Sequence, residues 1–259
     1  MKNLQAKSQK NLIKQGDIFR LGDHAIACGD SRDKELINQL VKGTKIKAVI
    51  SDVPYGINYV GSKNNFKQKI RMPKDILNDG CQTDEQYSQF TREWLQAIVP
   101  HLEKKNSIYI FNSDKMVFAL RQAMEEEGIT FSQLIIWIKN QAVVGRKDYL
   151  PQHELIAYGW HGSHKFLKSK DKSIIFCPKP SKSALHPTMK PVSLIRHLIL
   201  NSTRVNDYIF DGFLGSGTAV IAAEQVKRKC LGVEIDAQYI QSIIDRYHRL
   251  TGVKAEKIN

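Results

Sequence analysis

Hydrophobic positions along the chain fall into two patterns that alternate over most of its length. Short apolar runs rich in β-branched residues, such as 46–50, are typical of strands buried in a parallel sheet. Apolar residues at helical spacing, as at Tyr87, Phe90 and Trp94, are typical of helices that pack one face against such a sheet. We predict strands over residues 17–21, 24–28, 46–50, 107–111, 131–138, 154–158, 207–210 and 229–233. We predict helices over residues 33–41, 84–101, 114–127, from Pro191 to near Ser202, 219–226 and 236–250. Asp30 or Ser31 is the expected N-cap of the first helix, and Asp236 that of the last.

The order of these elements predicts a single α/β domain over residues 1–259. Because most strands are separated by a helix, we expect a mostly parallel sheet with helices on both faces. The strands at 131–138 and 154–158 have no helix between them, so we expect them to form an antiparallel pair at one edge of the sheet. The 259 residues, 42% of them hydrophobic, are enough for one large core or two small domains, and we favour one core.

The chain carries a large positive charge, with 39 Lys and Arg against 26 Asp and Glu and a formal net charge of +13. Such an excess indicates a polyanionic partner, of which nucleic acid is the first candidate. Residues 59–80 are predicted to form a mobile basic loop, and residues 160–182 a small target-recognition insertion in which lysines alternate with aromatic residues. A solvated surface is the alternative for the loop 59–80 and for the basic turn at 139–147. The candidate DNA contacts are Lys63, Lys67, Lys69, Arg71, Lys139, Arg146, Lys165, Lys168 and Lys170.

Two further features narrow the class of protein. No apolar run approaches the roughly 18 residues that span a bilayer, so we expect a soluble, cytoplasmic protein with no membrane partner. The four cysteines are far apart and form no C-x-x-C pair, which argues against a zinc module or a disulfide framework and favours reduced thiols. His161 and His164 are followed by Cys177 but lack a fourth ligand, and we expect no metal site.

The first candidate site is the tetrapeptide from Asp52 to Tyr55, at the end of the predicted strand 46–50. Open α/β sheets bind their ligands at the carboxyl ends of strands. Val53 precedes Pro54, which keeps the backbone extended and fixes the direction of the Val53 carbonyl beside the Asp52 carboxylate. Two acceptors and the flat ring of Tyr55 suit a planar group that bears an amine, such as a nucleobase. A strand end followed by an ordinary turn is the alternative.

The second candidate site is a glycine-rich turn between a predicted strand and a predicted helix. Gly212, Gly215 and Gly217 let the backbone approach a ligand closely, and the start of the helix presents free N–H groups. Glu234 ends the next strand, near the roughly 20-residue separation of the acid that binds ribose hydroxyls in Rossmann units. Val220 stands where the third glycine of a dinucleotide fingerprint belongs. The spacing therefore indicates an adenine nucleoside and leaves the identity of the cofactor open.

Together these passages resemble the beta-class DNA amino-methyltransferases, in which the catalytic motif precedes the cofactor motif. Residues 52–55 resemble the family's D-P-P-Y motif, residues 210–218 its F-x-G-x-G-T motif, and residues 186–191 its H-P-T-x-K-P block. Residues 29–31 match a further family position, and the matches cover almost the whole chain in the family's order. One departure is Val53 in place of the first proline, which we expect to weaken rigidity while still supplying a carbonyl.

The resemblance implies S-adenosylmethionine as the methyl donor and a Rossmann-like methyltransferase fold, with a mostly parallel seven-stranded sheet and one antiparallel edge strand. It implies that the catalytic residues are Asp52, Val53, Pro54 and Tyr55. The residues it implies for the donor are Asp30, Ser31, Thr188, Lys190, Asp211, Phe213, Gly215, Ser216, Gly217, Thr218 and Glu234. In this assignment the methionine end lies against the glycine turn, the ribose on Glu234, and the adenine near Asp30 and Ser31.

The resemblance also implies site-specific methylation of double-stranded DNA. Aspartate at position 52 is similar to adenine-N6 enzymes, whereas serine is more usual in cytosine-N4 enzymes, so the favoured target is N6 of a flipped adenine. The alternatives are cytosine N4, RNA, and a nucleic-acid-binding protein without catalysis; a nicotinamide-dependent oxidoreductase is least favoured. A homodimer and a cognate restriction endonuclease are open partners, and the resemblance suggests a bacterial, phage or mobile-element origin.

Overall fold

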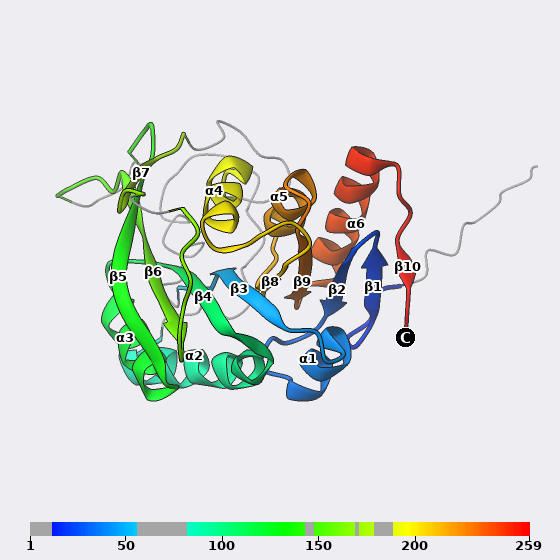
Figure 1. Ribbon diagram of the computed structural model, residues 1–259, viewed down its shortest axis with the longest axis horizontal. Helices are drawn as coiled ribbons and strands as arrows, with labels where there is room; N and C mark the ends of the chain where they lie inside the picture. Colours follow the sequence, from blue (N-terminus) through cyan, green and yellow to red (C-terminus); the bar gives the residue numbers. More distant parts are fainter. Residues whose placement is uncertain (1–11, 56–81, 143–147, 169–170, 179–188) are drawn as a thin grey trace, which may run out of the picture.

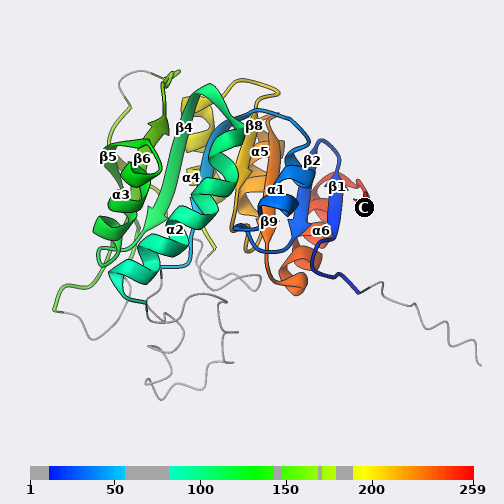
Figure 2. The same ribbon diagram turned by 90° about the horizontal axis from the view of Figure 1, so that it is seen from below.

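The computed structural model of the protein describes residues 12–55, 82–142, 148–168, 171–178 and 189–259 (Figure 1). The predicted basic loop 59–80 lies outside the described residues, and so does part of the predicted insertion 160–182. Within the described chain the predicted α/β class is confirmed, because one sheet is covered by helices on both faces (Figures 1 and 2).

Ten strands form a single sheet in the described part of the chain, in the order β10-β1-β2-β9-β8-β3-β4-β6-β5-β7. Their bounds are β1 Ile18–Leu21, β2 His24–Cys28, β3 Ile46–Asp52, β4 Leu102–Asn112, β5 Ile129–Ile138, β6 His153–His161, β7 Ile174–Phe176, β8 Tyr208–Asp211, β9 Lys229–Glu234 and β10 Glu256–Lys257. Each predicted strand is present. The first residues of β4 were not predicted as strand, because Glu103, Lys104 and Lys105 are charged and at least partly exposed.

The seven strands implied by the family resemblance and the placement of the antiparallel pair at the edge are both wrong, since the sequence pattern predicts eight strands and the described sheet has ten. Two short strands, β7 and β10, add to the ends of the sheet, and neither has the length or apolar pattern by which a strand is recognised from sequence. The antiparallel pairing of β5 with β6 is confirmed. However, β6 also pairs antiparallel with β4, and β7 pairs in parallel with β5 on its outer side, so neither strand of the pair forms the edge.

Among the described residues, the α-helices cover the sheet in two groups of three. One face carries α1 (Lys34–Val41), α2 (Asp84–Ile98) and α3 (Val117–Glu126), with a 3-10 turn, η2 (Val99–His101), after α2; the other face carries α4 (Val192–Ser202), α5 (Thr218–Gln225) and α6 (Ala237–Thr251) (Figures 1 and 2). Each group buries its own hydrophobic cluster, around Trp94 on the first face and around Ile199 and Ile243 on the second. The sheet therefore has both faces buried, which explains the near-continuous apolar runs of its central strands.

The N-terminus of α1 corrects one detail of the sequence prediction. Asp30 or Ser31 was expected to cap this helix, but the cap is Asp33, whose side chain accepts from the backbone N–H groups of Glu35 and Leu36. Asp30 and Ser31 are therefore free for other contacts. The predicted cap of α6 by Asp236 is confirmed.

The topology brings two strand ends together at the centre of the sheet. β3 lies between β8 and β4 and runs parallel to both. The chain leaves β3 toward β4 on one side, whereas β8 and β9 return to the other side, and α/β sheets bind ligands at such a switch in direction. Val49 pairs with Phe210 in the register of β3 and β8. Asp52 and Asp211 therefore end neighbouring strands at the same edge.

Candidate active site

The Asp52 carboxylate, at the end of β3, has a partner on each oxygen. The hydroxyl of Tyr55 lies 3.1 Å from Asp52 Oδ1, and Lys190 Nζ lies 2.5 Å from Asp52 Oδ2. Val53 is buried and anchors the backbone that follows the strand. The structure thus brings the two polar residues of the predicted tetrapeptide together and adds a lysine to them.

Lys190 precedes α4, and its ammonium is enclosed by oxygen atoms. Besides Asp52, its Nζ lies 3.1 Å from Glu154 Oε2 and 3.4 Å from the hydroxyl of Tyr55. Sequence reasoning assigned Lys190 to the methyl donor, whereas the structure directs its ammonium to the Asp52 side of the site.

Lys139 and Glu154 complete this cluster from the antiparallel strands. Lys139 directly follows β5, is buried, and places its Nζ 2.7 Å from Glu154 Oε1. We expected Lys139 to contact DNA, but its charge is paired inside the protein. Sequence reasoning missed Glu154, for which the one available signal is a carboxylate at the start of the otherwise apolar strand predicted at 154–158.

Burial and charge pairing act differently on the two carboxylates. Burial raises the pKa of Asp52; Lys190 opposes this shift and Glu154 adds to it. Burial acts on Glu154 in the same direction, but Lys190 and Lys139 together lower the pKa of Glu154 to about 2. The pKa of Lys190 is raised although burial opposes the shift, because both carboxylates face it. Asp52 is therefore the carboxylate that takes up a proton more readily.

The glycine-rich turn connects β8 to α5 with an unusual backbone. Gly215 and Gly217 have φ angles of 50° and 75°, a region that side chains disfavour. A Cβ atom at position 217 would lie 2.8 Å from Ile243 Cγ1, so this position needs glycine on steric grounds as well. The N–H of Phe213 donates to Asp211 Oδ1 at 3.0 Å, which ties the turn to the end of β8.

Glu234 ends β9 beneath this turn. Its carboxylate accepts hydrogen bonds from the N–H of Gly215 at 2.7 Å and from the N–H of Asp236 at 2.9 Å. Burial raises the pKa of Glu234 to about 7. Burial also raises the pKa of Asp211 to about 7, and the nearby charge of Asp52 contributes to that shift. Buried acids of this kind, grouped at a strand edge, are candidates for ligand binding.

Ser31 provides the test of whether this edge fits a polar ligand. It is buried, and among the described residues no group hydrogen-bonds to its hydroxyl. It faces the glycine turn, because a Cβ atom at Gly212 would lie 3.3 Å from Ser31 Cβ. A buried hydroxyl without a protein partner is unfavourable unless another group satisfies it. This edge therefore offers an unpaired buried hydroxyl to a polar ligand.

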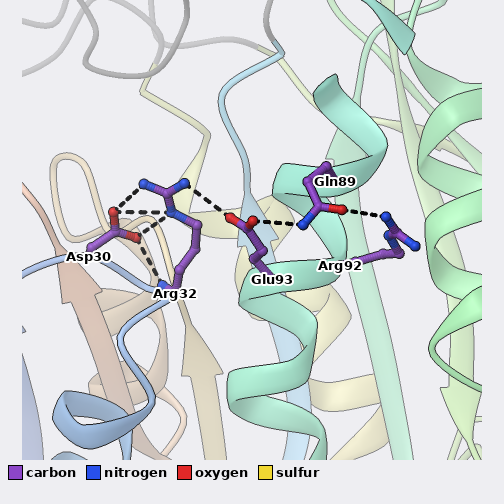
Figure 3. A network of polar contacts seen from close by, with 5 residues as sticks. All are labelled: Asp30, Arg32, Gln89, Arg92 and Glu93. Atoms are coloured by element: carbon purple, nitrogen blue, oxygen red, sulfur yellow. Dashed lines mark hydrogen bonds and ion pairs between the residues drawn. The ribbon is translucent and has the colours of Figure 1, made fainter. Parts of the chain in front are cut away.

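A network of polar contacts joins the loop after β2 to helix α2 (Figure 3). Arg32 donates to both carboxylate oxygens of Asp30, with Nη2 to Oδ2 at 2.7 Å, and its Nη1 lies 3.1 Å from Glu93 Oε2. Gln89 donates to the other oxygen of Glu93 at 2.8 Å and accepts from Arg92. Burial opposes the shift, but hydrogen bonds from Arg32 lower the pKa of Asp30. Sequence reasoning missed this bridge.

Phe213 of the glycine turn packs against the same helix. Its ring centroid lies 5.8 Å from that of Phe90 and 5.7 Å from that of Trp94. The guanidinium of Arg32 lies 5.4 Å from the centre of the Phe90 ring. Helix α2 therefore links the glycine turn to the loop that carries Asp30.

The two candidate sites share one edge of the sheet. The N–H of Gly212 donates to the hydroxyl of Ser51 at 3.1 Å, so the glycine turn is hydrogen-bonded to the residue that precedes Asp52. A methyl donor on the turn and an amine on Asp52 would accordingly meet at neighbouring strand ends.

A family model described as a DNA methylase, which covers N6 and N4 amino-methyltransferases, matches residues 46–245, more than half of the chain. The chain belongs to this DNA methylase family. The protein is thus an S-adenosylmethionine-dependent DNA methyltransferase, as the three sequence motifs indicated.

Curated relatives of the methyltransferase include type II methyltransferases of bacteria. The chain is 24% identical over 223 residues to M2.LlaDCHI of Lactococcus lactis subsp. cremoris, a match that covers 78% of the chain and 81% of that relative. It is 26% identical over 228 residues to M.HpaI of Haemophilus parainfluenzae, covering 78% of the chain and 68% of that relative.

Solved structures share the fold of the methyltransferase. The complex of M1.HpyAVI with S-adenosylmethionine superposes with a TM-score of 0.63 at 24% identity, covering 85% of this chain and 98% of that one. The cytosine-N4-specific PvuII DNA methyltransferase superposes with a TM-score of 0.64 at 16% identity, covering 88% and 92%. At these identities the superpositions establish the fold alone.

The remaining residues predicted for DNA and donor binding are partly outside the described chain. Lys165 and Lys168 are exposed on the segment after β6. Those outside the described residues are Lys63, Lys67, Lys69, Arg71, Arg146, Lys170 and Thr188.

The ring of His164 stacks on that of Trp160, with 3.7 Å between the ring centroids. Over the described residues no group of three or more potential metal ligands is found, and no helix there is long and apolar enough to cross a membrane.

Proposed function

We propose that this methyltransferase transfers the methyl group of S-adenosylmethionine to the exocyclic N6 amine of an adenine flipped out of duplex DNA. The observation that carries the proposal is the Asp52 carboxylate at the strand end beside the glycine turn. A carboxylate offers about four lone-pair positions. Lys190 and Tyr55 occupy two of them, which leaves acceptor capacity for the hydrogen of an amine.

The chemistry requires orientation and charge stabilisation. The lone pair of an adenine amine is delocalised into the ring, so the nitrogen is a poor nucleophile. If Asp52 and the Val53 carbonyl accept its two hydrogens, the nitrogen can pyramidalise and direct its lone pair outward. As positive charge develops on nitrogen, the Asp52 carboxylate stabilises it. The raised pKa of Asp52 also suits this carboxylate to receive the amine proton.

S-adenosylmethionine supplies an electrophilic methyl group when it is bound. On the proposed assignment, Glu234 binds the ribose hydroxyls, Ser31 and Asp30 lie beside the adenine, and the turn from Asp211 to Thr218 holds the methionine end. Thr188 belongs to the same assignment. The unsatisfied Ser31 hydroxyl and the raised pKa of Glu234 support it.

The DNA contacts follow from charge. A base buried in a duplex must be flipped out before its amine can reach Asp52, at a cost of a few kcal/mol, and stacking on an aromatic ring such as that of Tyr55 offsets part of this cost. Phosphate contacts would hold the distorted duplex. The exposed Lys165 and Lys168 are the described candidates, and the basic residues of 59–80 remain part of the proposal.

The choice between adenine and cytosine rests on the aspartate at position 52. The test incubates the protein with isotopically labelled S-adenosylmethionine and plasmid DNA, digests the DNA to nucleosides, and separates them by chromatography. We expect label in N6-methyladenine and none in a sample with D52N protein. Label in N4-methylcytosine would overturn the choice of base, label in an RNA competitor would overturn the choice of nucleic acid, and equal labelling by D52N would overturn the role of Asp52.

A further inference from the structure

A chain of alternating charges extends from Asp52 into the protein, through Lys190 and Glu154 to Lys139. Asp52 has the most exposed side chain of the four, at 27%, followed by Glu154 at 18%, whereas the side chains of Lys190 and Lys139 are only 6% and 5% exposed. Asp52 is thus the member that faces outward. The two lysines are buried, and Glu154 pairs with both of them.

We propose that Glu154 is a positioning residue for methyl transfer: it pairs with the same ammonium of Lys190 that contacts Asp52 and so fixes the orientation of the Asp52 carboxylate. This inference rests on the proposed function. It assigns to the antiparallel strand β6 a role in a reaction whose reacting groups otherwise come from β3 and β8.

The count of donors and acceptors supports this role. A lysine ammonium has three N–H donors, and Lys190 Nζ faces three oxygens, at 2.5 Å on Asp52, 3.1 Å on Glu154 and 3.4 Å on Tyr55. Glu154 Oε2 also lies 3.1 Å from the hydroxyl of Tyr55. Lys190 therefore contacts one oxygen of each carboxylate, and the single proton of the Tyr55 hydroxyl is shared between the other oxygen of Asp52 and the same oxygen of Glu154.

Lys139 explains how Glu154 stays in place. The Lys139 ammonium lies 2.7 Å from the other carboxylate oxygen of Glu154, Oε1, so each oxygen of Glu154 has a lysine partner. The charges of the two lysines and the two carboxylates sum to zero. Without the charge of Glu154, two buried lysines would share the single carboxylate of Asp52. Removing one partner of a buried pair is costly, because it leaves a charge uncompensated.

The charges around Asp52 predict the direction in which each substitution shifts the pKa of its carboxylate. The charged and titratable groups that face Asp52 are Lys190 before α4, Tyr55 on its own segment, Glu154 on β6 and Asp211 on β8. The Glu154 charge raises the pKa of Asp52, and the Lys190 charge lowers it. E154Q should therefore move the acidic limb of the pH profile of kcat/KM to lower pH, and K190Q should move it to higher pH.

The experiment compares E154Q with two further variants in methyl transfer to duplex DNA. In K139M/E154Q the buried charges again balance, so a loss that persists there is not a consequence of the unpaired Lys139. E103Q is the matched control, because Glu103 pairs with Lys47 at 3.0 Å near the other end of β3 and β4. Stability of each protein is followed by urea unfolding.

We expect E154Q to lower kcat by about 10- to 100-fold with KM and donor Kd within about threefold, the pattern of an interaction that acts in the transition state. We expect K139M/E154Q to regain stability while kcat stays low, and E103Q to match the wild type. A wild-type kcat in E154Q, an unmoved acidic limb, or full recovery of kcat in K139M/E154Q would each overturn the positioning role. Absence of methylated product with the wild-type protein would instead refute the proposed function itself.

Discussion

The buried carboxylate of Glu234 should lower the free energy of unfolding of the protein without donor, a cost that a role in donor binding would explain. Its carboxylate lies beneath the glycine turn, 8% exposed, and burial raises its pKa from 4.5 to about 7. In the unfolded chain the same group loses its proton near pH 4.5. Between these values the folded state binds more protons than the unfolded state, so the free energy of unfolding falls as the pH rises through this window.

The size of the effect follows from the shift. A difference of 7 − 4.5 = 2.5 pKa units corresponds to about 3 kcal/mol at pH 8, at 1.36 kcal/mol for each unit. Glutamine at this position cannot ionise, so E234Q avoids this cost. Its single side-chain oxygen can replace only one of the two acceptors that serve Gly215 and Asp236, a loss of about 1 kcal/mol. E234Q should therefore be more stable than the wild type by about 2 kcal/mol at pH 8 and less stable by about 1 kcal/mol at pH 4.

The assay is urea unfolding of wild-type, E234Q and E103Q proteins at several pH values from 4 to 8, without the donor. Calorimetry with S-adenosylmethionine follows on the same proteins. We expect the stability difference for E234Q to change sign across this range while donor affinity drops about 10-fold or more, because a charge-assisted hydrogen bond contributes roughly 1.5–3 kcal/mol. E103Q should show neither effect.

Two results would refute this reasoning. If E234Q were destabilised equally at pH 4 and pH 8, burial of a charged carboxylate would not be the source of the cost. If E234Q bound the donor as tightly as the wild type, the ribose would not lie on Glu234.

Three further variants test separate parts of the site. Gly43 and Gly217 both have φ near 76°, but only a Cβ atom at position 217 would be crowded, by Ile243. G43A should lower the free energy of unfolding by about 1–2 kcal/mol through its left-handed backbone alone, and G217A should lower it by more. Equal losses in urea unfolding would contradict the crowding at position 217. S31A should leave stability without donor almost unchanged while weakening donor binding in calorimetry, and unchanged binding would remove Ser31 from the site. DNA affinity should fall steeply with salt, and K165Q/K168Q should reduce the slope of log K against log salt by about 2; an unchanged slope in a filter-binding titration would show that these lysines do not contact phosphate.

Much of the fold was predictable because its central strands and helices carry strong periodic signals. The strand ending at Asp52, the glycine turn and the acid at Glu234 were all placed from local sequence. The short strands β7 and β10 could not be, because pairing with a neighbour defines them and their own composition does not. The position of β6 inside the sheet likewise depends on pairing with β4 and β5, two strands on different sides of it.

The predicted site shows the same division. Motif residues next to each other in sequence could be assigned together, whereas the charge chain combines Lys139, Glu154 and Lys190 with a residue about a hundred positions earlier. A lysine in a basic protein is usually solvent-facing, and nothing local distinguished Lys139 from exposed lysines such as Lys165. Only the register of β5 against β6 and the start of α4 bring these groups to Asp52.

The central claim is that donor binding and amine activation are performed by separate residues at one edge of the sheet. The most direct test measures, for the same D52N protein, calorimetric affinity for S-adenosylmethionine and the rate of label transfer from that donor to duplex DNA in a single turnover. We expect donor affinity within about threefold of the wild type and a transfer rate at least about 100-fold lower, as for loss of a group that stabilises developing charge. Transfer at the wild-type rate by a D52N protein that binds the donor normally would contradict the account.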